Sequence, residues 1–546
     1  MPSTPTTKSQ VQAYKFVLRR MQSALVRRDA VMLHDPMRSH GRATAVGVIL
    51  GVLGAVVFVL WGLLSPAPSV PSSDNIVIGE QSGTVYVVTG NPARLIPTFN
   101  LASARLILMA QKQQGGQGQQ GGQGQQGGQQ QAAEVKNPTV VSDEQLKNMP
   151  REKLTGIPDG PQLIPSADQR TTPNWAVCDE VVLDPSLPQP DSVGKTNTDV
   201  IAGIDKLGGE LQENQALLGD AGNGKTYLIY RLPATQSHPN ANTVRAEVPS
   251  GSNDPVRSAL HLPTKSRKVS QALLNAIPEV TKLTPPPVAG EGTTPPSSFD
   301  GLTVGSVFST QPSGGALEFW LIAKSGIQKV SPAVADIVRT AKSGGSAITP
   351  TLTLDKINNV KVLQPGDPDY VQVDTYPKVV PTVLDAAQGS PVACLGWSLS
   401  ADGSQAHTSV YINKQIPVEK NADGTSKIIS VSNTGPNGVP ITGFYMPTGY
   451  GAVVQSATES EKTFGKGPIQ LISDRGIRYG VPDAATAEEL GLNNRLPAPE
   501  SIIGLLPTGA SLNVQNVMKQ FDSVPIDPNA GSYKPQAAGQ QQPAGN

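Results

Sequence analysis

Residues 219–226, GDAGNGKT, have a spacing that could support nucleotide chemistry. They match G-x-x-x-x-G-K-[ST], in which glycine N–H groups wrap phosphates, the lysine reaches them and the hydroxyl holds Mg²⁺. Such a loop needs a helix after it, so that the helix N-terminus faces the anion. Here YLIYRLP follows, which favours a strand and ends in proline. The sequence therefore predicts a glycine-rich hairpin turn, with ATP and Mg²⁺ bound at Gly219, Gly224, Lys225 and Thr226 as the alternative.

The other side chains that could do chemistry are scattered along the chain. The histidines lack a metal-binding spacing such as H-E-x-x-H, and no G-x-S-x-G nucleophile motif is present. We therefore expect no catalytic residue, no metal and no resident cofactor. The two cysteines are Cys178, in WAVCDEVV, and Cys394, in PVACLGWS. Outside the cytoplasm such a pair favours a disulfide, and two separately buried thiols are the alternative.

The glycine-rich segment and both cysteines follow a long apolar segment, Ala43–Leu64, which contains no charged residue. As a helix its 22 residues would span roughly 33 Å, enough for a bilayer core of about 30 Å. It is preceded by 42 residues, unlike the short n-region of a cleaved signal peptide. We therefore expect a single transmembrane anchor in the cell inner membrane.

The residues before the anchor are basic, with eight Lys and Arg against two Asp. Positive charge on one flank predicts a cytoplasmic N-terminus and an extracytoplasmic, periplasmic C-terminal region. The chain is neutral overall, with 43 basic and 43 acidic residues, so the part after residue 42 carries 35 − 41 = −6. An acidic outer region argues against nucleic-acid binding, which needs a basic face.

Residues 9–33 show the periodicity of an amphipathic helix. Such a helix can lie on the anionic inner leaflet or dock in a partner's groove. A basic topogenic segment without any partner is the alternative. The apolar positions that we predict to form the docking stripe are Val11, Tyr14, Leu18, Met21 and Leu25.

Beyond the membrane, the chain repeats a small pattern. Residues 319–340 and 469–490 each read as a strand, a turn with Gly326 or Gly476, a second strand, and a helix opened by Pro332 or Pro482. Residues 86–108 and 227–262 resemble this pattern more loosely. Repeats of this kind must pack on one another or on a core to be stable, and they usually act as scaffolds or binding surfaces.

The expected fold is therefore α+β. One N-terminal transmembrane helix precedes strand–turn–strand–helix repeats around a disulfide-linked, β-rich centre. A Gln/Gly tract, QKQQGGQGQQGGQGQQGGQQQ, cannot bury a core and predicts a flexible tether or an inert loop insertion. The expected segments are a cytoplasmic helix (1–42), the anchor (43–64), a first repeat (65–110), the Gln/Gly linker (111–133), the repeat and core domain (134–527) and a disordered tail (528–546).

Several long segments closely resemble EccB, a membrane-anchored family of actinobacterial type VII (ESX) secretion systems. The likeness keeps order and spacing to about residue 520. It departs from the family pattern at the Gln/Gly tract, which interrupts the spacing, and in the Trp-poor sequence after Cys394. The segments that carry it are TTKSQVQAYKFVLRRMQSALVRRDAVMLHDPMRS, GTVYVV, FNLASARLIL, NPTVVSDEQLKNMPREKLTGIPDGP, WAVCDEV, RGIRYGVPDAATAEELGL and IIGLLPTGASLNVQNV.

The resemblance implies a structural role in an inner-membrane core complex with EccC, the motor ATPase, and with EccD and EccE. It implies that Val11–Leu33 docks on partner subunits, that Cys178 pairs with Cys394, and that the outer domain self-associates. The family is also described as ATP-binding, so an ATPase is the runner-up function. Cell-wall binding through the repeats is a third hypothesis, compatible with the first.

Overall fold

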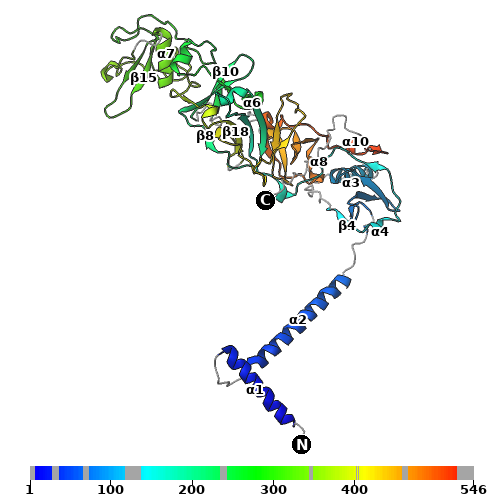
Figure 1. Cartoon of the computed structure of the whole chain (residues 1–546). Helices are drawn as coiled ribbons and strands as arrows, with labels where there is room; N and C mark the ends of the chain where they lie inside the picture. Colours follow the sequence, from blue (N-terminus) through cyan, green and yellow to red (C-terminus); the bar gives the residue numbers. More distant parts are fainter. Residues whose placement is uncertain are drawn as a thin grey trace. The chain divides into compact units, whose positions relative to one another are not determined.

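The computed structural model describes residues 7–27, 36–64, 70, 73–116, 137–233, 243–343, 348–400, 403, 405–457 and 465–524. The chain divides into two compact units, Met1–Val70 and Pro71–Asn546 (Figure 1). The expected tail from residue 528 lies outside the described residues, as does most of the Gln/Gly tract.

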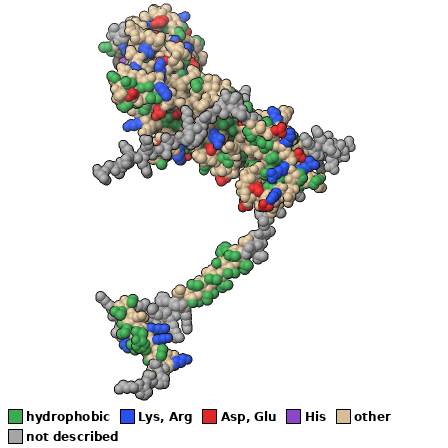
Figure 2. All heavy atoms as spheres, turned by 45° about the vertical axis from the view of Figure 1, so that its right-hand side comes forward, with side chains coloured by type: hydrophobic (Ala, Val, Ile, Leu, Met, Phe, Trp, Pro, Cys, Tyr) green, Lys and Arg blue, Asp and Glu red, His purple; other side chains and the backbone are tan. Residues whose placement is uncertain are grey.

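In the described part of the first unit, the chain forms helices α1 (Lys8–Arg27) and α2 (Pro36–Leu64). Helix α2 is long and apolar enough to cross a membrane over Ala43–Gly62, where the mean hydropathy is 2.6. Figure 2 shows hydrophobic side chains along its surface, as expected of a helix that faces lipid. The helix begins at Pro36 rather than at Ala43, because proline is favourable at the first helical position.

The second unit contains four copies of one topology, called repeats 1 to 4. Each copy is a three-stranded antiparallel meander followed by a helix. A segment after the helix then pairs in parallel with the first strand, and a later one with the third strand. A parallel partner requires a crossover connection, and the helix supplies it.

The bounds of these elements follow in chain order. Repeat 1 has β1 (Asn75–Gly79), β2 (Val85–Thr89), β3 (Arg94–Thr98), α3 (Leu101–Gly116), β4 (Thr139–Val141) and β5 (Leu154–Thr155). Repeat 2 has β9 (Gln215–Asp220), β10 (Thr226–Arg231), β11 (Thr243–Val248), α5 (Pro255–Ala259), β12 (Arg267–Lys268) and β13 (Glu279–Val280). Repeat 3 has β14 (Val307–Thr310), β15 (Glu318–Ala323), β16 (Gly326–Val330) and α7 (Pro332–Ser343), with single parallel bridges at Thr351 and Val362. Repeat 4 has β22 (Gly451–Ala457), β23 (Ile469–Ser473), β24 (Arg478–Val481), α8 (Ala484–Glu489) and β25 (Leu496–Pro499), with a bridge at Thr508.

Between the repeats lies a central seven-stranded sheet of order β20-β21-β7-β6-β18-β19-β8. Its strands are β6 (Trp175–Val181), β7 (Thr196–Ala202), β8 (Gly209–Glu210), β18 (Val392–Leu399), β19 (Ala406–Asn413), β20 (Ile429–Ser430) and β21 (Gly443–Tyr445). The remaining short elements are α4 (Asp143–Leu146), α6 (Gln271–Ala276), β17 (Thr382–Val383), α9 (Glu500–Ile503), α10 (Val514–Val517), β26 (Gln520–Phe521) and the 3-10 helices at Ala167–Gln169, Pro190–Val193, Leu354–Lys356 and Ala386–Gln388.

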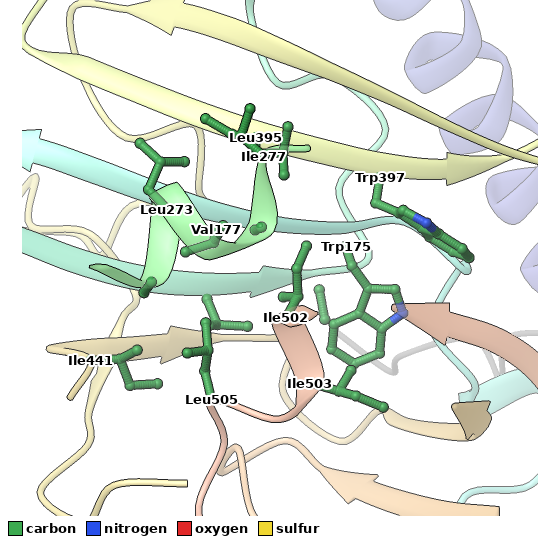
Figure 3. Close-up of a cluster of buried hydrophobic side chains, with 14 of the residues drawn as sticks. Trp175, Val177, Leu273, Ile277, Leu395, Trp397, Ile441, Ile502, Ile503 and Leu505 are labelled. Carbon is green, nitrogen blue, oxygen red and sulfur yellow. The ribbon is translucent and has the colours of Figure 1, made fainter. Parts of the chain in front are cut away.

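Shared hydrophobic cores join these parts in an order that differs from their order in the chain. Repeats 1 and 4 share a core that includes Val87 and Leu471, and repeats 2 and 3 share one that includes Leu228 and Leu321. The largest core joins repeat 2, the central sheet and repeat 4. Figure 3 shows its centre, where α6 and α9 bring leucine and isoleucine side chains together with Trp175 of β6. The order of contact is therefore repeat 1, repeat 4, central sheet, repeat 2 and repeat 3.

The repeat pattern predicted from sequence is confirmed in all four places. Each predicted copy contains the second strand, the third strand and the helix of one repeat. The sequence did not reveal the first strand or the later parallel strands. Helix α3 also extends to Gly116, into the tract expected to be a linker, and Lys112 in its last turns lies with its Nζ 2.9 Å from the carboxylate of Glu489.

Two details of the predicted alignment are wrong. Gly476 lies in the turn of repeat 4 with φ +76°, whereas Gly326 is a strand residue that pairs with Ala323. At Gly326, an added Cβ would overlap the carbonyl oxygen of Lys361, so this glycine permits close backbone approach. Helix α7 does begin at Pro332, but α8 begins at Ala484, two positions after Pro482.

Candidate functional site

The Gly219–Thr226 segment forms a β-hairpin turn between β9 and β10, in which Asp220 pairs with Thr226. The Asp220 carboxylate accepts a hydrogen bond from the Gly222 N–H at 2.8 Å. Gly222 and Gly224 have φ of +74° and +80°, a region that glycine adopts without strain. The turn geometry therefore accounts for these glycines. The segment that follows is strand β10 (Thr226–Arg231), not the helix that a phosphate loop requires after it.

Lys225 points to a carboxylate on the neighbouring strand. Its Nζ lies 2.8 Å from Glu247 Oε2 on β11, and Lys282 Nζ lies 2.8 Å from the other oxygen of the same carboxylate. The hydrogen bond and charge of Glu247 raise the pKa of Lys225, and the two lysines lower the pKa of Glu247. This arrangement ties two strands of repeat 2 together at the surface.

Cys178 and Cys394 form a disulfide in the centre of the seven-stranded sheet. They lie directly opposite each other on the antiparallel pair β6 and β18, and both are fully buried. The bond joins segments separated by 216 residues in sequence. It therefore fixes the register of the two strands on which the largest core rests.

Next to the disulfide on β6, Asp179 is a buried carboxylate that the sequence reasoning missed. Its oxygens accept hydrogen bonds from Ser270 N (2.6 Å), Ser270 Oγ (2.7 Å) and Thr198 Oγ1 (2.8 Å). Burial raises its pKa, and these hydrogen bonds and the Arg267 charge oppose that rise. Ser270 caps α6, so Asp179 anchors this helix to the sheet. The signal in the sequence was an acidic residue inside an apolar strand, WAVCDEVV.

The opposite face of the sheet carries a second buried carboxylate, Asp199, on β7 directly across from Cys178. Burial, together with the charges of Glu180 and Asp179, raises its pKa to about 6. Its charge is thus costly to keep inside the protein at neutral pH. These carboxylates do not form a metal site: in the described ranges, no group of three His, Cys, Asp or Glu residues could hold an ion.

The predicted docking stripe lies on α1 and is exposed along its length. Exposed fractions rise from 37% at Leu18 to 83% at Leu25. Phe16 and Val17, which the prediction omitted, are 61% and 50% exposed, so the apolar surface is wider than one stripe. The predicted helix extended to residue 33, but the described helix ends at Arg27 and residues 28–35 lie outside the described ranges.

Comparison with known families gives one model that matches almost the whole chain. Residues 3–526 match the model of the type VII secretion system ESX-1, transport TM domain B. The match thus includes both units of the structure, the two N-terminal helices and the four repeats.

Curated relatives match over similar lengths. The chain is 26% identical over 537 residues to the ESX-1 secretion system ATPase EccB1 of Mycolicibacterium smegmatis, covering 96% of this chain and 97% of that protein. It is 27% identical over 543 residues to the ESX-3 secretion system ATPase EccB3 of Mycobacterium tuberculosis, covering 95% and 90%.

Solved structures share the fold. A chain of the intact ESX-5 inner membrane complex superimposes with a TM-score of 0.65 at 25% identity, covering 98% of this chain and 99% of that one. The EccB3 dimer of the ESX-3 core complex gives a TM-score of 0.62 at 23% identity, covering 82% and 100%. At that identity the second likeness is evidence of fold only.

Proposed function

The chain belongs to the EccB family of type VII secretion components, and on that premise we propose that it is a structural subunit of the inner-membrane core complex of an ESX-type secretion system. One observation carries the proposal: the likeness to a chain of the intact ESX-5 inner membrane complex covers both chains almost completely. A subunit that keeps the whole length of its relative keeps the membrane helix as well as the outer repeats. The expected partners are subunits of the EccC, EccD and EccE type.

The chain is an inner-membrane protein, and α2 is its membrane helix. For its orientation we propose a cytoplasmic N-terminus and extracytoplasmic repeats. The eight basic residues before the apolar segment support this direction by the positive-inside rule. The Cys178–Cys394 disulfide supports it independently, because disulfides persist in oxidising compartments outside the cytoplasm.

We propose that α1 docks on a partner subunit through its exposed apolar side chains. Val11, Tyr14, Leu18, Met21 and Leu25 recur every three or four residues, the spacing with which helices enter a hydrophobic groove. Figure 2 shows Lys and Arg side chains next to these apolar groups, which would add charge complementarity with an acidic rim on the partner.

The test is gentle detergent extraction of the tagged full chain from its native membrane, followed by native-gel sizing and identification of co-purifying subunits. We expect a large assembly that contains a motor ATPase and a multi-spanning channel subunit. Leu18→Asp should reduce this assembly at least about tenfold, because an unpaired charge buried at an interface costs more than 1.4 kcal/mol. Gln12→Asp adds the same charge to the same helix outside the stripe and should leave the assembly unchanged. Migration of the wild type as a free monomer or dimer would contradict the proposal.

ATP hydrolysis is the second candidate function, because the names of the relatives include the word ATPase and residues 219–226 fit the phosphate-loop pattern. We propose instead that this segment acts as a turn, on the grounds that a strand follows it and that Glu247 neutralises Lys225. Self-association of the outer unit and a contact of the repeats with the cell wall also remain proposals. Cross-linking of the full chain in its membrane would test the first of these.

A further inference from the structure

The connection between β19 and β20 crosses one whole face of the central sheet. In the order β20-β21-β7-β6-β18-β19-β8, four strands separate the two strands that it joins. At about 4.8 Å between neighbouring strands, the chain must cover a distance of roughly 24 Å. We call this connection, residues 414–428, the strap.

The strap lies on the face of the sheet that carries the disulfide. Its Ile416 belongs to the small cluster of buried residues that contains Cys178 and Cys394, and Val418 and Ile428 pack against that cluster. The other face of the sheet packs on α6 and α9 in the largest core (Figure 3). The strap is therefore part of the cover that keeps both cysteines fully buried.

This cover is thin and is held largely within itself. Of residues 414–428, all of which the structure describes, only Ile416 is buried. The strap folds as a hairpin, in which the Lys427 N–H donates to the Glu419 carbonyl oxygen at 2.9 Å and the two side chains form an exposed ion pair at 2.7 Å. Segments with few buried apolar contacts and exposed hydrogen bonds open with a free energy well below that of global unfolding.

A buried carboxylate beside the disulfide favours this opening. Asp199 lies directly across from Cys178 and is 4% exposed. An added Cβ at Gly443, the β21 residue paired with Asp199, would overlap both the Asp199 carboxylate and Ile428 of the strap. The strap thus borders this carboxylate, and burial raises its pKa. Lifting the strap hydrates the charge, which offsets part of the loss of apolar contacts.

We propose that the strap controls access to the Cys178–Cys394 disulfide, and that thiols reach it when the strap lifts while the rest of the outer unit stays folded. A thiolate of a dithiol attacks one sulfur of the disulfide, and the other sulfur leaves as a thiolate. The second thiolate of the reductant then attacks the mixed disulfide and releases the second cysteine. The dithiol is oxidised to its cyclic disulfide, and the protein disulfide is reduced to two thiols. This redox-sensitive site goes beyond assembly of the secretion complex and does not depend on it.

The experiment is reduction of the folded full chain by dithiothreitol, followed by alkylation and mass spectrometry. The chain contains two cysteines, so the alkylated fraction reports this disulfide alone. For the wild type we expect a reduction rate that is nearly independent of urea below the unfolding transition, because a local opening exposes little surface. Ile416→Ala removes the buried contact of the strap and should raise the rate at least about tenfold. Val418→Ala should act in the same direction, so the conclusion does not depend on one variant.

Two further isoleucine-to-alanine changes are matched controls. Ile429 follows the strap directly and is 47% exposed, whereas Ile337 is fully buried in α7, in the core shared by repeats 2 and 3. Both variants should keep the wild-type reduction rate, although Ile337→Ala lowers the global free energy of unfolding. Resistance of the wild type to reduction until the urea transition, or equal acceleration by Ile337→Ala and Ile416→Ala, would show that reduction requires global unfolding and would overturn the proposal.

Discussion

The hairpin of repeat 2 and the β6 strand of the central sheet both set a basic residue near a carboxylate, but in opposite surroundings. At the hairpin, the Lys225 side chain is 52% exposed and shares Glu247 with Lys282. On β6, Asp179 is 1% exposed, and Arg267, whose charge acts on it, is 6% exposed. Exposed ion pairs contribute little to stability, whereas removing one member of a buried polar cluster is costly. The phosphate-loop pattern at residues 219–226, which stands out in the sequence, therefore lies in the region where a substitution is expected to change folding stability less.

Removing the disulfide beside Asp179 should lower folding stability more than any change at the hairpin. A double Cys178→Ala, Cys394→Ala variant releases a cross-link between residues 216 positions apart. Without the cross-link the unfolded chain gains conformational entropy, so the free energy of unfolding should fall by up to about 5 kcal/mol. Urea unfolding of the full chain can be followed by the fluorescence of Trp175 and Trp397, which lie in the adjoining core (Figure 3). A variant as stable as the oxidised wild type would show that the core alone holds the sheet together.

A smaller but still large loss is expected for Asp179→Ala. This change leaves the Ser270 N–H and the Thr198 hydroxyl without their acceptor and removes the carboxylate near Arg267. We expect a loss of about 3–5 kcal/mol in the same unfolding experiment. Asp179→Asn keeps one acceptor oxygen and should lose less. Equal losses for the two variants would mean that the hydrogen bonds to Ser270 and Thr198 do not account for the effect.

The energetic cost of burying the Asp199 carboxylate can be measured from the pH dependence of the free energy of unfolding. Its pKa is raised to about 6 in the folded protein, above about 3.9 in an unfolded chain. Between these values the folded state binds more protons, so the free energy of unfolding decreases as pH rises through this window. Asp199→Asn removes this pH-dependent loss. The free energy of unfolding of the variant, relative to that of the wild type, should therefore rise by about 3 kcal/mol between pH 4 and pH 6 and stay constant outside this range.

The difference between wild type and variant isolates Asp199 from carboxylates whose pKa is lowered, such as Asp220 beside Lys268. A difference that stays constant from pH 4 to 7.5 would mean that Asp199 titrates normally in the folded protein. The hairpin of repeat 2 should add nothing to this difference, since its carboxylates titrate alike in the wild type and in the variant.

The part of the fold that the sequence could predict is the part in which paired strands lie close together along the chain. The strand–turn–strand–helix part of each repeat is contiguous, so its periodicity and turn glycines were sufficient. The later parallel strands are as short as two residues, as in β12 and β13, and carry no periodicity of their own. The central sheet pairs β7 with β21, which are separated by 244 positions along the chain at Thr198 and Thr442, and no local pattern reports such a pairing.

The same argument holds for the sites. The hairpin turn was predictable because the features that form it are local. The Gly222 N–H donates to Asp220, and Gly222 and Gly224 adopt positive φ within the same few residues. The anchoring role of Asp179 was not predictable, since Ser270 lies 91 positions away. The alignment of Gly326 with Gly476 failed because one glycine permits a turn and the other permits close backbone approach.

The smallest expected effect is the one that tests the hairpin most directly. Lys225→Ala removes an exposed ion pair while Lys282 continues to neutralise Glu247, so the urea midpoint of unfolding should stay at the wild-type value. Gly224→Ala forces a Cβ into a turn position with φ +80° and should cost about 1–2 kcal/mol.

A structural turn therefore requires the glycine change to be the more harmful of the two, in both urea unfolding and the yield of the native assembly. A phosphate loop requires the reverse ranking in ATP turnover, because the lysine is the residue that reaches the phosphates. Measuring both variants for stability, assembly and ATP hydrolysis by the purified full chain decides between them. Loss of a measurable ATPase activity in Lys225→Ala, with stability intact, would make this hairpin a nucleotide site despite the strand that follows it.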